Sequence, residues 1–158
     1  MEPRLDYGKA APGAVNAMLG LEKYLHGCSL EANLIHLVKL RVSQINGCAY
    51  CIDMHWKDLR ALGESEQRLY ELAAWDETDF YSERERAALA WAESLTAIAE
   101  THAPDEVYEE VRRQFSEKEL VDLALVITTI NAWNRLAIAF RAPAGTYQPA
   151  SAVGAGRR

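Results

Sequence analysis

The 158-residue chain has little of what marks secreted, membrane-spanning or disulfide-rich proteins. It contains only three cysteines, an odd number, and its N-terminus lacks the basic and apolar segments of a secretory signal. The longest apolar run, residues 123–134, is shorter than the roughly 18 residues that indicate a membrane span. We therefore expect a cytoplasmic protein with reduced thiols, and a chain of this length can bury a core without disulfide or metal staples.

Positive charge is also scarce. The chain has 17 Lys and Arg residues against 23 Asp and Glu residues, which gives a formal net charge of −6. Such a balance disfavours unspecific attraction to nucleic acid or to anionic lipid. We therefore expect neither nucleic acid nor a membrane among the partners.

No convincing run alternates apolar and polar residues as a β-strand does, whereas helical spacing of apolar residues recurs along most of the chain. Several segments begin with residues that can cap a helix, namely Ser29, Ser65, Ser82 with Glu85, and Ser116 with Glu119. Pro104 suits the first turn of a shorter helix. The expected helices span residues 14–26, 29–46, 48–62, 65 onward, 82–98, 104–115 and 116–140.

The sequence thus predicts a single all-α domain over residues 1–141, built as a bundle of about six to eight helices. Its final helix is apolar on nearly all sides from Leu120 to Ile130, so we expect it at the centre of the bundle or beneath a neighbouring subunit. Residues 142–158 are small and rich in Pro and Gly, and we expect a flexible C-terminal tail or an arm that orders on another subunit.

The most informative stretch is QINGCAYCIDMH, residues 44–55. On a helix that begins at or next to Cys48, the side chains of Cys48, Cys51 and His55 share one face. The residues expected more to the outside are Asp53, Lys57, Asp58 and Arg60. The helix start favours a thiolate at Cys48, and His55 follows Cys51 by one turn. Two cysteines at this spacing can close a disulfide, so one thiol can attack a substrate and the other can resolve the product.

Other interpretations of the cysteine pair remain open. A structural zinc site needs four ligands, and the chain has no second Cys-x-x-Cys pair. The further candidate ligands are His26, Cys28, His36 and His102. An iron–sulfur cluster usually takes four cysteines, and haem attachment needs a histidine where this chain has Ile52. The thiols can also be small buried core residues. Because two thiols and an imidazole share one face, we favour redox chemistry and predict no metal.

A resemblance to a known family is carried by residues 37–64, LVKLRVSQINGCAYCIDMHWKDLRALGE. This stretch resembles the core motif of the alkyl hydroperoxidase D (AhpD)-like family, within the carboxymuconolactone decarboxylase superfamily. Residues 130–141, INAWNRLAIAFR, are similar to the matching C-terminal stretch of its short single-domain members. The resemblance implies an AhpD-like all-helical fold and subunits that assemble into dimers, trimers or hexamers. It also implies a thiol-dependent peroxidase without a bound cofactor.

The resemblance implies a role for each residue of the motif. Cys51, the cysteine nearer the histidine, attacks the peroxide O–O bond and becomes a sulfenic acid. Cys48 resolves it as a disulfide, and His55 passes protons. A dithiol such as a lipoyl group or a thioredoxin-like protein supplies the electrons. The helix start at Cys48 favours the opposite order, in which the first cysteine attacks.

One position departs from the family pattern. Twelve residues before the first cysteine, the best-known members have a glutamate that ends the proton relay, whereas this chain has His36. An imidazole can also pass protons near neutral pH. It does not supply the fixed negative charge of a carboxylate. His36 is therefore a candidate relay residue.

Two other functions are alternatives. The superfamily is named for a lactone decarboxylase, but members with that activity generally lack the cysteine pair. A disulfide that switches packing would instead make the chain a non-enzymatic redox sensor or assembly module. Trp133, beside Asn134 and Arg135, could line the site in the assembled protein.

Overall fold

The structure is a computed structural model that describes residues 2–149. Within these residues it is helical without a β-strand, which confirms the all-α prediction. The elements are α1 (Tyr7–Ala10), α2 (Pro12–His26), α3 (Ala32–Asn46), α4 (Ala49–Ala61), α5 (Glu66–Glu71), the 3₁₀ helix η1 (Leu72–Glu77), α6 (Glu83–Thr96), α7 (Ile98–Thr101), α8 (Asp105–Gln114) and α9 (Glu117–Phe140). The short helices α1 and α7 are additions to the predicted set.

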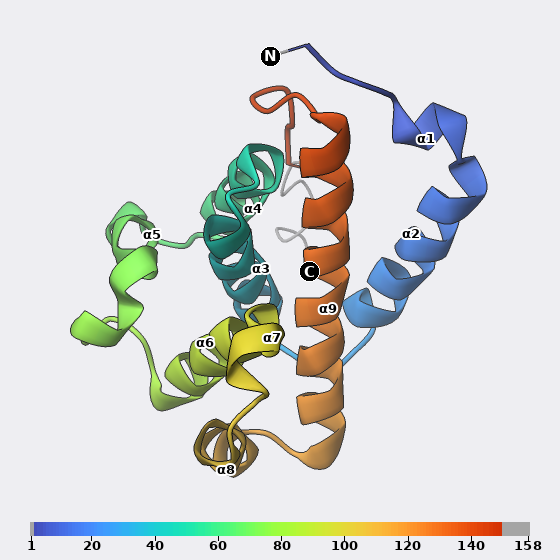
Figure 1. Ribbon diagram of the computed structural model, residues 1–158. Helices are drawn as coiled ribbons and strands as arrows, with labels where there is room; N and C mark the ends of the chain where they lie inside the picture. Colours follow the sequence, from blue (N-terminus) through green and yellow to red (C-terminus); the bar gives the residue numbers. More distant parts are fainter. Residues whose placement is uncertain (1, 150–158) are drawn as a thin grey trace, which may run out of the picture.

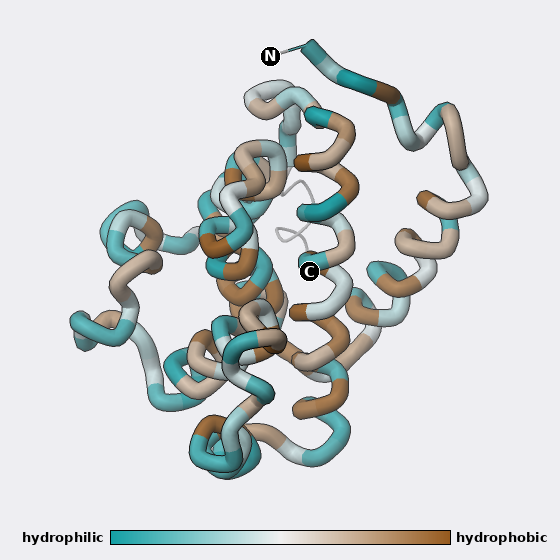
Figure 2. Tube along the Cα trace, viewed as in Figure 1, coloured by the Kyte–Doolittle hydropathy of each residue, from teal (hydrophilic) through white to brown (hydrophobic). Residues whose placement is uncertain are grey.

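Helix α9 is the central element of the bundle (Figure 1). It packs against α2, α3, α4, α6 and α8. Leu123, Val126 and Ile130 are at most 1% exposed, and Figure 2 shows apolar residues along much of the helix. The central position predicted for the final helix is therefore confirmed, although Val121 is 68% exposed. Taken whole, α9 is also long and apolar enough to cross a membrane, but its packing is that of a core helix.

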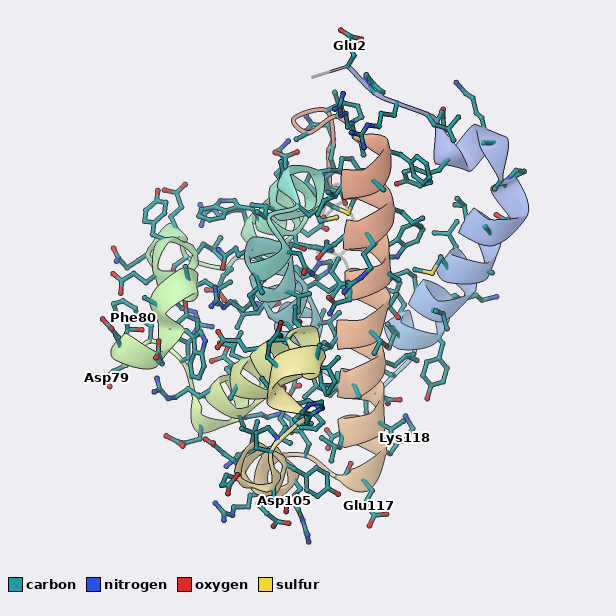
Figure 3. The ribbon with its side chains drawn as sticks, in the orientation of Figure 1. Glu2, Asp79, Phe80, Asp105, Glu117 and Lys118 are labelled. Atoms are coloured by element: carbon teal, nitrogen blue, oxygen red, sulfur yellow. The ribbon has the colours of Figure 1, made fainter. Side chains whose placement is uncertain are left out.

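Serine caps begin several helices as predicted. The Ser82 and Ser116 hydroxyls accept from the N–H groups of Glu85 and Glu119, whose carboxylates accept from the serine N–H groups in return. Ser65 caps α5 through one backbone N–H. These bonds satisfy donors that would otherwise be unpaired at a helix start. Figure 3 shows the first α9 residues, Glu117 and Lys118, at the outer end of the bundle.

Two predicted helix starts are displaced. Ser29 does not cap the second predicted helix, because α3 begins at Ala32 with Glu31 at its N-cap position. Leu30, which lies between Ser29 and α3, packs its side chain into the core, and the helix begins only after it. Pro104 lies at the N-cap of α8, one residue before the first turn.

The reversal between α3 and α4 determines how these helices face each other. Gly47 has a φ of +68°, a left-handed conformation that glycine adopts without the steric cost of a side chain. Across this turn the N–H of Cys48 donates to the Ser43 carbonyl, 3.0 Å away. As a result α4 starts at once, with Cys48 at its N-cap, and packs along α3.

A polar seam ties α3 to α9. The Asn46 amide donates to Asn131 and to Asn134, at 2.9 Å each. Asn134 is fully buried and donates to the Ser43 hydroxyl, 3.1 Å away. Because buried polar groups are costly when unpaired, this network fixes the relative position of the two core helices.

Ser116→Ala is expected to lower the free energy of unfolding by about 1 kcal/mol, because it removes the side-chain acceptor at the start of the central helix. Ser29→Ala is the matched control, since Ser29 is exposed and lies outside the α3 cap. Its effect should stay within about 0.5 kcal/mol. Urea unfolding followed by circular dichroism measures both values. Equal losses for the two variants would contradict the helix starts described above.

Candidate thiol site

A cavity of about 750 Å³ is lined by residues of α2, α3, α4 and α9. Three predicted site residues line it, namely Cys51, His55 and His36. Much of the remaining wall is apolar, including Leu25 from α2 and Ile130 from α9. A cavity of this kind, apolar with a few converging polar groups, is typical of sites for small organic molecules.

Both cysteines of the motif are buried at the start of α4. Cys48 and Cys51 are 1% and 3% exposed, and both are free thiols. Cys51 is among the residues that line the cavity, whereas Cys48, at the helix N-cap, is not. A molecule in the cavity would therefore meet the Cys51 thiol first.

The two thiols differ in acidity. The neighbouring Cys51 thiol, the Cys51 N–H and the Asn134 amide lower the pKa of Cys48 to about 7, against the opposing effect of burial. The neighbouring Cys48 thiol, together with burial, raises the pKa of Cys51. The pair as a whole therefore loses its first proton more readily than an ordinary thiol.

The imidazoles of His55 and His36 lie against each other. Their Nδ1 atoms are 3.2 Å apart, which is hydrogen-bond distance, so one ring donates and the other accepts. Burial lowers the pKa of both rings, and the pKa of His55 falls well below its usual value. The side chain of His55 is 7% exposed and that of His36 is 20% exposed. The two imidazoles thus connect a buried position, at His55, with a position nearer to solvent, at His36.

Asp58 also faces this pair, so the prediction that it lies on the outside of α4 was wrong. Its Oδ2 atom is 3.6 Å from His36 Nδ1 and 3.8 Å from His55 Nδ1, and its side chain is 14% exposed. Its Oδ1 atom accepts from the Tyr147 hydroxyl at 2.6 Å. The available sequence signal was the i,i+3 spacing from His55. This side of α4 is covered by a segment that lies far away in the sequence, the one that contains Tyr147.

Residues 142–149 supply that cover. Lys57 donates to the Tyr147 carbonyl at 3.0 Å, and the Gly145 N–H donates to the Asp53 carboxylate at 3.1 Å. Tyr147 and Pro149 line the cavity. The first part of the predicted tail therefore lies against α4 of its own chain, and residues 150–158 fall outside the described residues.

A buried ion pair also lines the cavity. Lys39 is 5% exposed, and its Nζ atom is 2.5 Å from Oε2 of Glu22. The Trp133 indole donates to the other carboxylate oxygen at 3.0 Å. Trp133 lines this cavity within the single chain, whereas Asn134 and Arg135 are not among its lining residues. Glu22 and Lys39 were missed, because neither residue belongs to a motif that points to a site.

Comparison with known proteins agrees with the fold and with the family resemblance. The model of the carboxymuconolactone decarboxylase family matches residues 10–94, more than half of the chain. The uncharacterized protein YdfG of Bacillus subtilis is 48% identical over 139 residues, which cover 88% of this chain and 95% of YdfG.

Solved structures share the same architecture. A protein of unknown function from Agrobacterium tumefaciens, described as a candidate antioxidant defence protein AhpD, is 45% identical, with a TM-score of 0.89 over 92% of this chain and 100% of its own. The debrominase Bmp8 is 24% identical, with a TM-score of 0.75 over 87% of this chain and 74% of its own, which shows the fold alone. The chain therefore belongs to the carboxymuconolactone decarboxylase family and has the AhpD-like all-α fold.

Proposed function

We propose that the protein is a thiol-dependent peroxidase that uses the Cys48–Cys51 pair. The observation that carries this proposal is that Cys51 and His55 line one cavity, while Cys48 lies buried one turn away at the start of the same helix. The structure has both cysteines free, and a free thiol is the form that attacks a peroxide. The name of the 45% identical Agrobacterium protein, which refers to antioxidant defence, supports the same class of reaction.

Two observations bear on which thiol attacks. Access favours Cys51, which lines the cavity, whereas acidity favours Cys48, whose pKa is lowered to about 7, chiefly by the neighbouring Cys51 thiol. Once the pair has lost one proton, the remaining proton can reside on either sulfur. When it moves onto Cys48, the thiolate forms at Cys51 and faces the cavity. We therefore propose Cys51 as the peroxidatic cysteine and Cys48 as the resolving cysteine.

In the proposed reaction the Cys51 thiolate attacks one peroxide oxygen and the O–O bond breaks. The leaving alkoxide takes up a proton and departs as an alcohol, and Cys51 is left as a sulfenic acid. The Cys48 thiol then attacks the Cys51 sulfur, which releases water and forms the Cys48–Cys51 disulfide. A dithiol donor reduces this disulfide by exchange and leaves as a disulfide itself.

The two imidazoles supply the proton for the alkoxide. His55 lines the cavity, and its Nδ1 atom is 3.2 Å from that of His36, which is partly exposed. A proton given up by His55 can be replaced through His36 from solvent. Asp58, 3.6 Å from His36, adds the carboxylate charge that an imidazole lacks.

The partners follow from this chemistry. The substrate is a peroxide, and the donor is a lipoyl group or a thioredoxin-like protein in a cytoplasm that keeps thiols reduced. We also propose a homo-oligomer, a dimer, trimer or hexamer. Leu19 on α2 and Leu62 at the end of α4 both line the cavity and are 50% and 46% exposed, which leaves apolar surface there for a second subunit.

Cys51→Ser is expected to abolish dithiol-dependent peroxide consumption, because it removes the attacking sulfur. Cys48→Ser is expected to stop at a Cys51 sulfenic acid, detected by mass spectrometry after one equivalent of peroxide. Cys28→Ser is the matched control, since Cys28 is a free thiol outside the motif, and it should react at the parent rate. The proposal is wrong if Cys51→Ser consumes peroxide as fast as the parent protein.

A thiolate is expected to appear with an apparent pKa near 7, because the pKa of Cys48 is lowered from its usual 9.0 to about 7. Below this pH the pair is protonated, and above it one thiolate is present, since the pKa of Cys51 is raised. Ultraviolet thiolate absorbance measured against pH tests this. Cys48→Ser should lose the transition and Cys28→Ser should keep it. A transition near pH 7 that survives in Cys48→Ser would assign it to another group.

His36→Phe is expected to slow peroxide consumption by about 100-fold, at the lower end of what a general acid or base contributes. His36→Glu is the matched variant, because it places the family's carboxylate at this position, and it should retain more activity than His36→Phe. Initial rates at saturating dithiol measure both variants. A His36→Phe protein that is folded and as active as the parent would remove His36 from the relay.

A further inference from the structure

We propose that His36, His55 and Asp58 form a binding site for one divalent first-row transition-metal ion of the Zn²⁺ class. Each residue offers one ligand atom, and the three atoms lie within 4.8 Å of one another. Neither cysteine takes part. The inference therefore goes beyond the peroxidase reaction and does not depend on it.

The spacing of the three atoms is close to that of ligands around one cation. The two Nδ1 atoms are 3.2 Å apart, and Asp58 Oδ2 is 3.6 and 3.8 Å from those of His36 and His55. Zinc–nitrogen and zinc–oxygen bonds of roughly 2.0–2.2 Å place neighbouring ligands about 3.0–3.6 Å apart. A small movement of the Asp58 carboxylate towards the two imidazoles would bring all three ligand atoms to these distances.

The donor types select the class of metal. Two imidazoles and one carboxylate suit Zn²⁺ and its first-row neighbours, whereas Mg²⁺ and Ca²⁺ take oxygen ligands. Zinc sites with three protein ligands keep a fourth position open for water or a small molecule. His36, His55 and Asp58 all line the cavity, which provides space for that fourth ligand.

The surroundings hold these ligands in place. The Tyr147 hydroxyl donates to Oδ1 of Asp58 at 2.6 Å, and the other carboxylate oxygen is the one nearer both imidazoles. A hydrogen bond of this kind orients a ligand from the outer shell of a metal site. His36 lies on α3 and His55 on α4, so both imidazoles are on packed helices rather than loops.

The local charges permit a bound cation. Lys39 is the buried cation on the cavity wall, and its charge is offset by Glu22, 2.5 Å away. Asp58 adds a negative charge beside the two imidazoles. Without metal, a single proton lies between the two Nδ1 atoms. A metal ion would replace that proton, so the bound form could not pass protons through the same nitrogens.

Isothermal titration calorimetry with Zn²⁺ on the reduced full-length chain tests the site. We expect one ion per chain, with the Cys48→Ser/Cys51→Ser double variant binding as tightly as the parent. Asp58→Asn and His36→Gln should each raise the Kd at least tenfold. His26→Gln is the matched control, because it removes another imidazole of the same cavity, and its Kd should equal that of the parent.

The visible spectrum of the Co²⁺-loaded parent should lack a sulfur-to-cobalt charge-transfer band. The inference is overturned if the parent binds no stoichiometric Zn²⁺, if the double cysteine variant loses binding, or if Asp58→Asn and His36→Gln both bind like the parent. Circular dichroism checks that each variant is folded. The double cysteine variant cannot carry out the proposed peroxidase reaction. Metal binding measured in this variant therefore tests the metal site independently of the proposed function.

Discussion

The left-handed turn at Gly47 is the constraint on which the site depends. Because the chain reverses there within one residue, α4 runs back along α3, and His55 on α4 meets His36 on α3. The same turn places Cys48 at the N-cap of α4. A Cβ atom at Gly47 would meet no neighbouring atom within 4 Å, so the demand for glycine comes from the backbone conformation and not from crowding.

Asn134 connects the packing of the core to the acidity of the thiols. It donates to Ser43 and accepts from Asn46, which holds α9 against α3. Its amide is also among the groups that favour the thiolate form of Cys48, after the Cys51 thiol and the Cys51 N–H. A shift of α9 along α3 would therefore change the chemistry of the pair as well as the stability of the bundle.

Local patterns in the sequence account for much of the fold and part of the site. The helical repeat of apolar residues and the Ser82 and Ser116 capping boxes act within one or two turns, so they can be recognised without tertiary information. The shared face of Cys51 and His55 follows from the same repeat. Asp58 could not be assigned to the site in this way, because Tyr147, which covers it, is 89 residues away. Glu22 meets Trp133 across 111 residues, a separation that no spacing rule describes.

The cover formed by residues 142–149 separates access to the cavity from the stability of the bundle. It is held on α4 by hydrogen bonds to Asp53, Lys57 and Asp58, and it includes no buried helix. Displacing it breaks two partly buried hydrogen bonds and one exposed hydrogen bond but leaves the α3–α9 seam intact, so it requires less free energy than unfolding the domain. Sequence changes at Tyr147 and Pro149 can therefore reshape the cavity wall at a smaller cost in stability than changes in the α3–α9 seam.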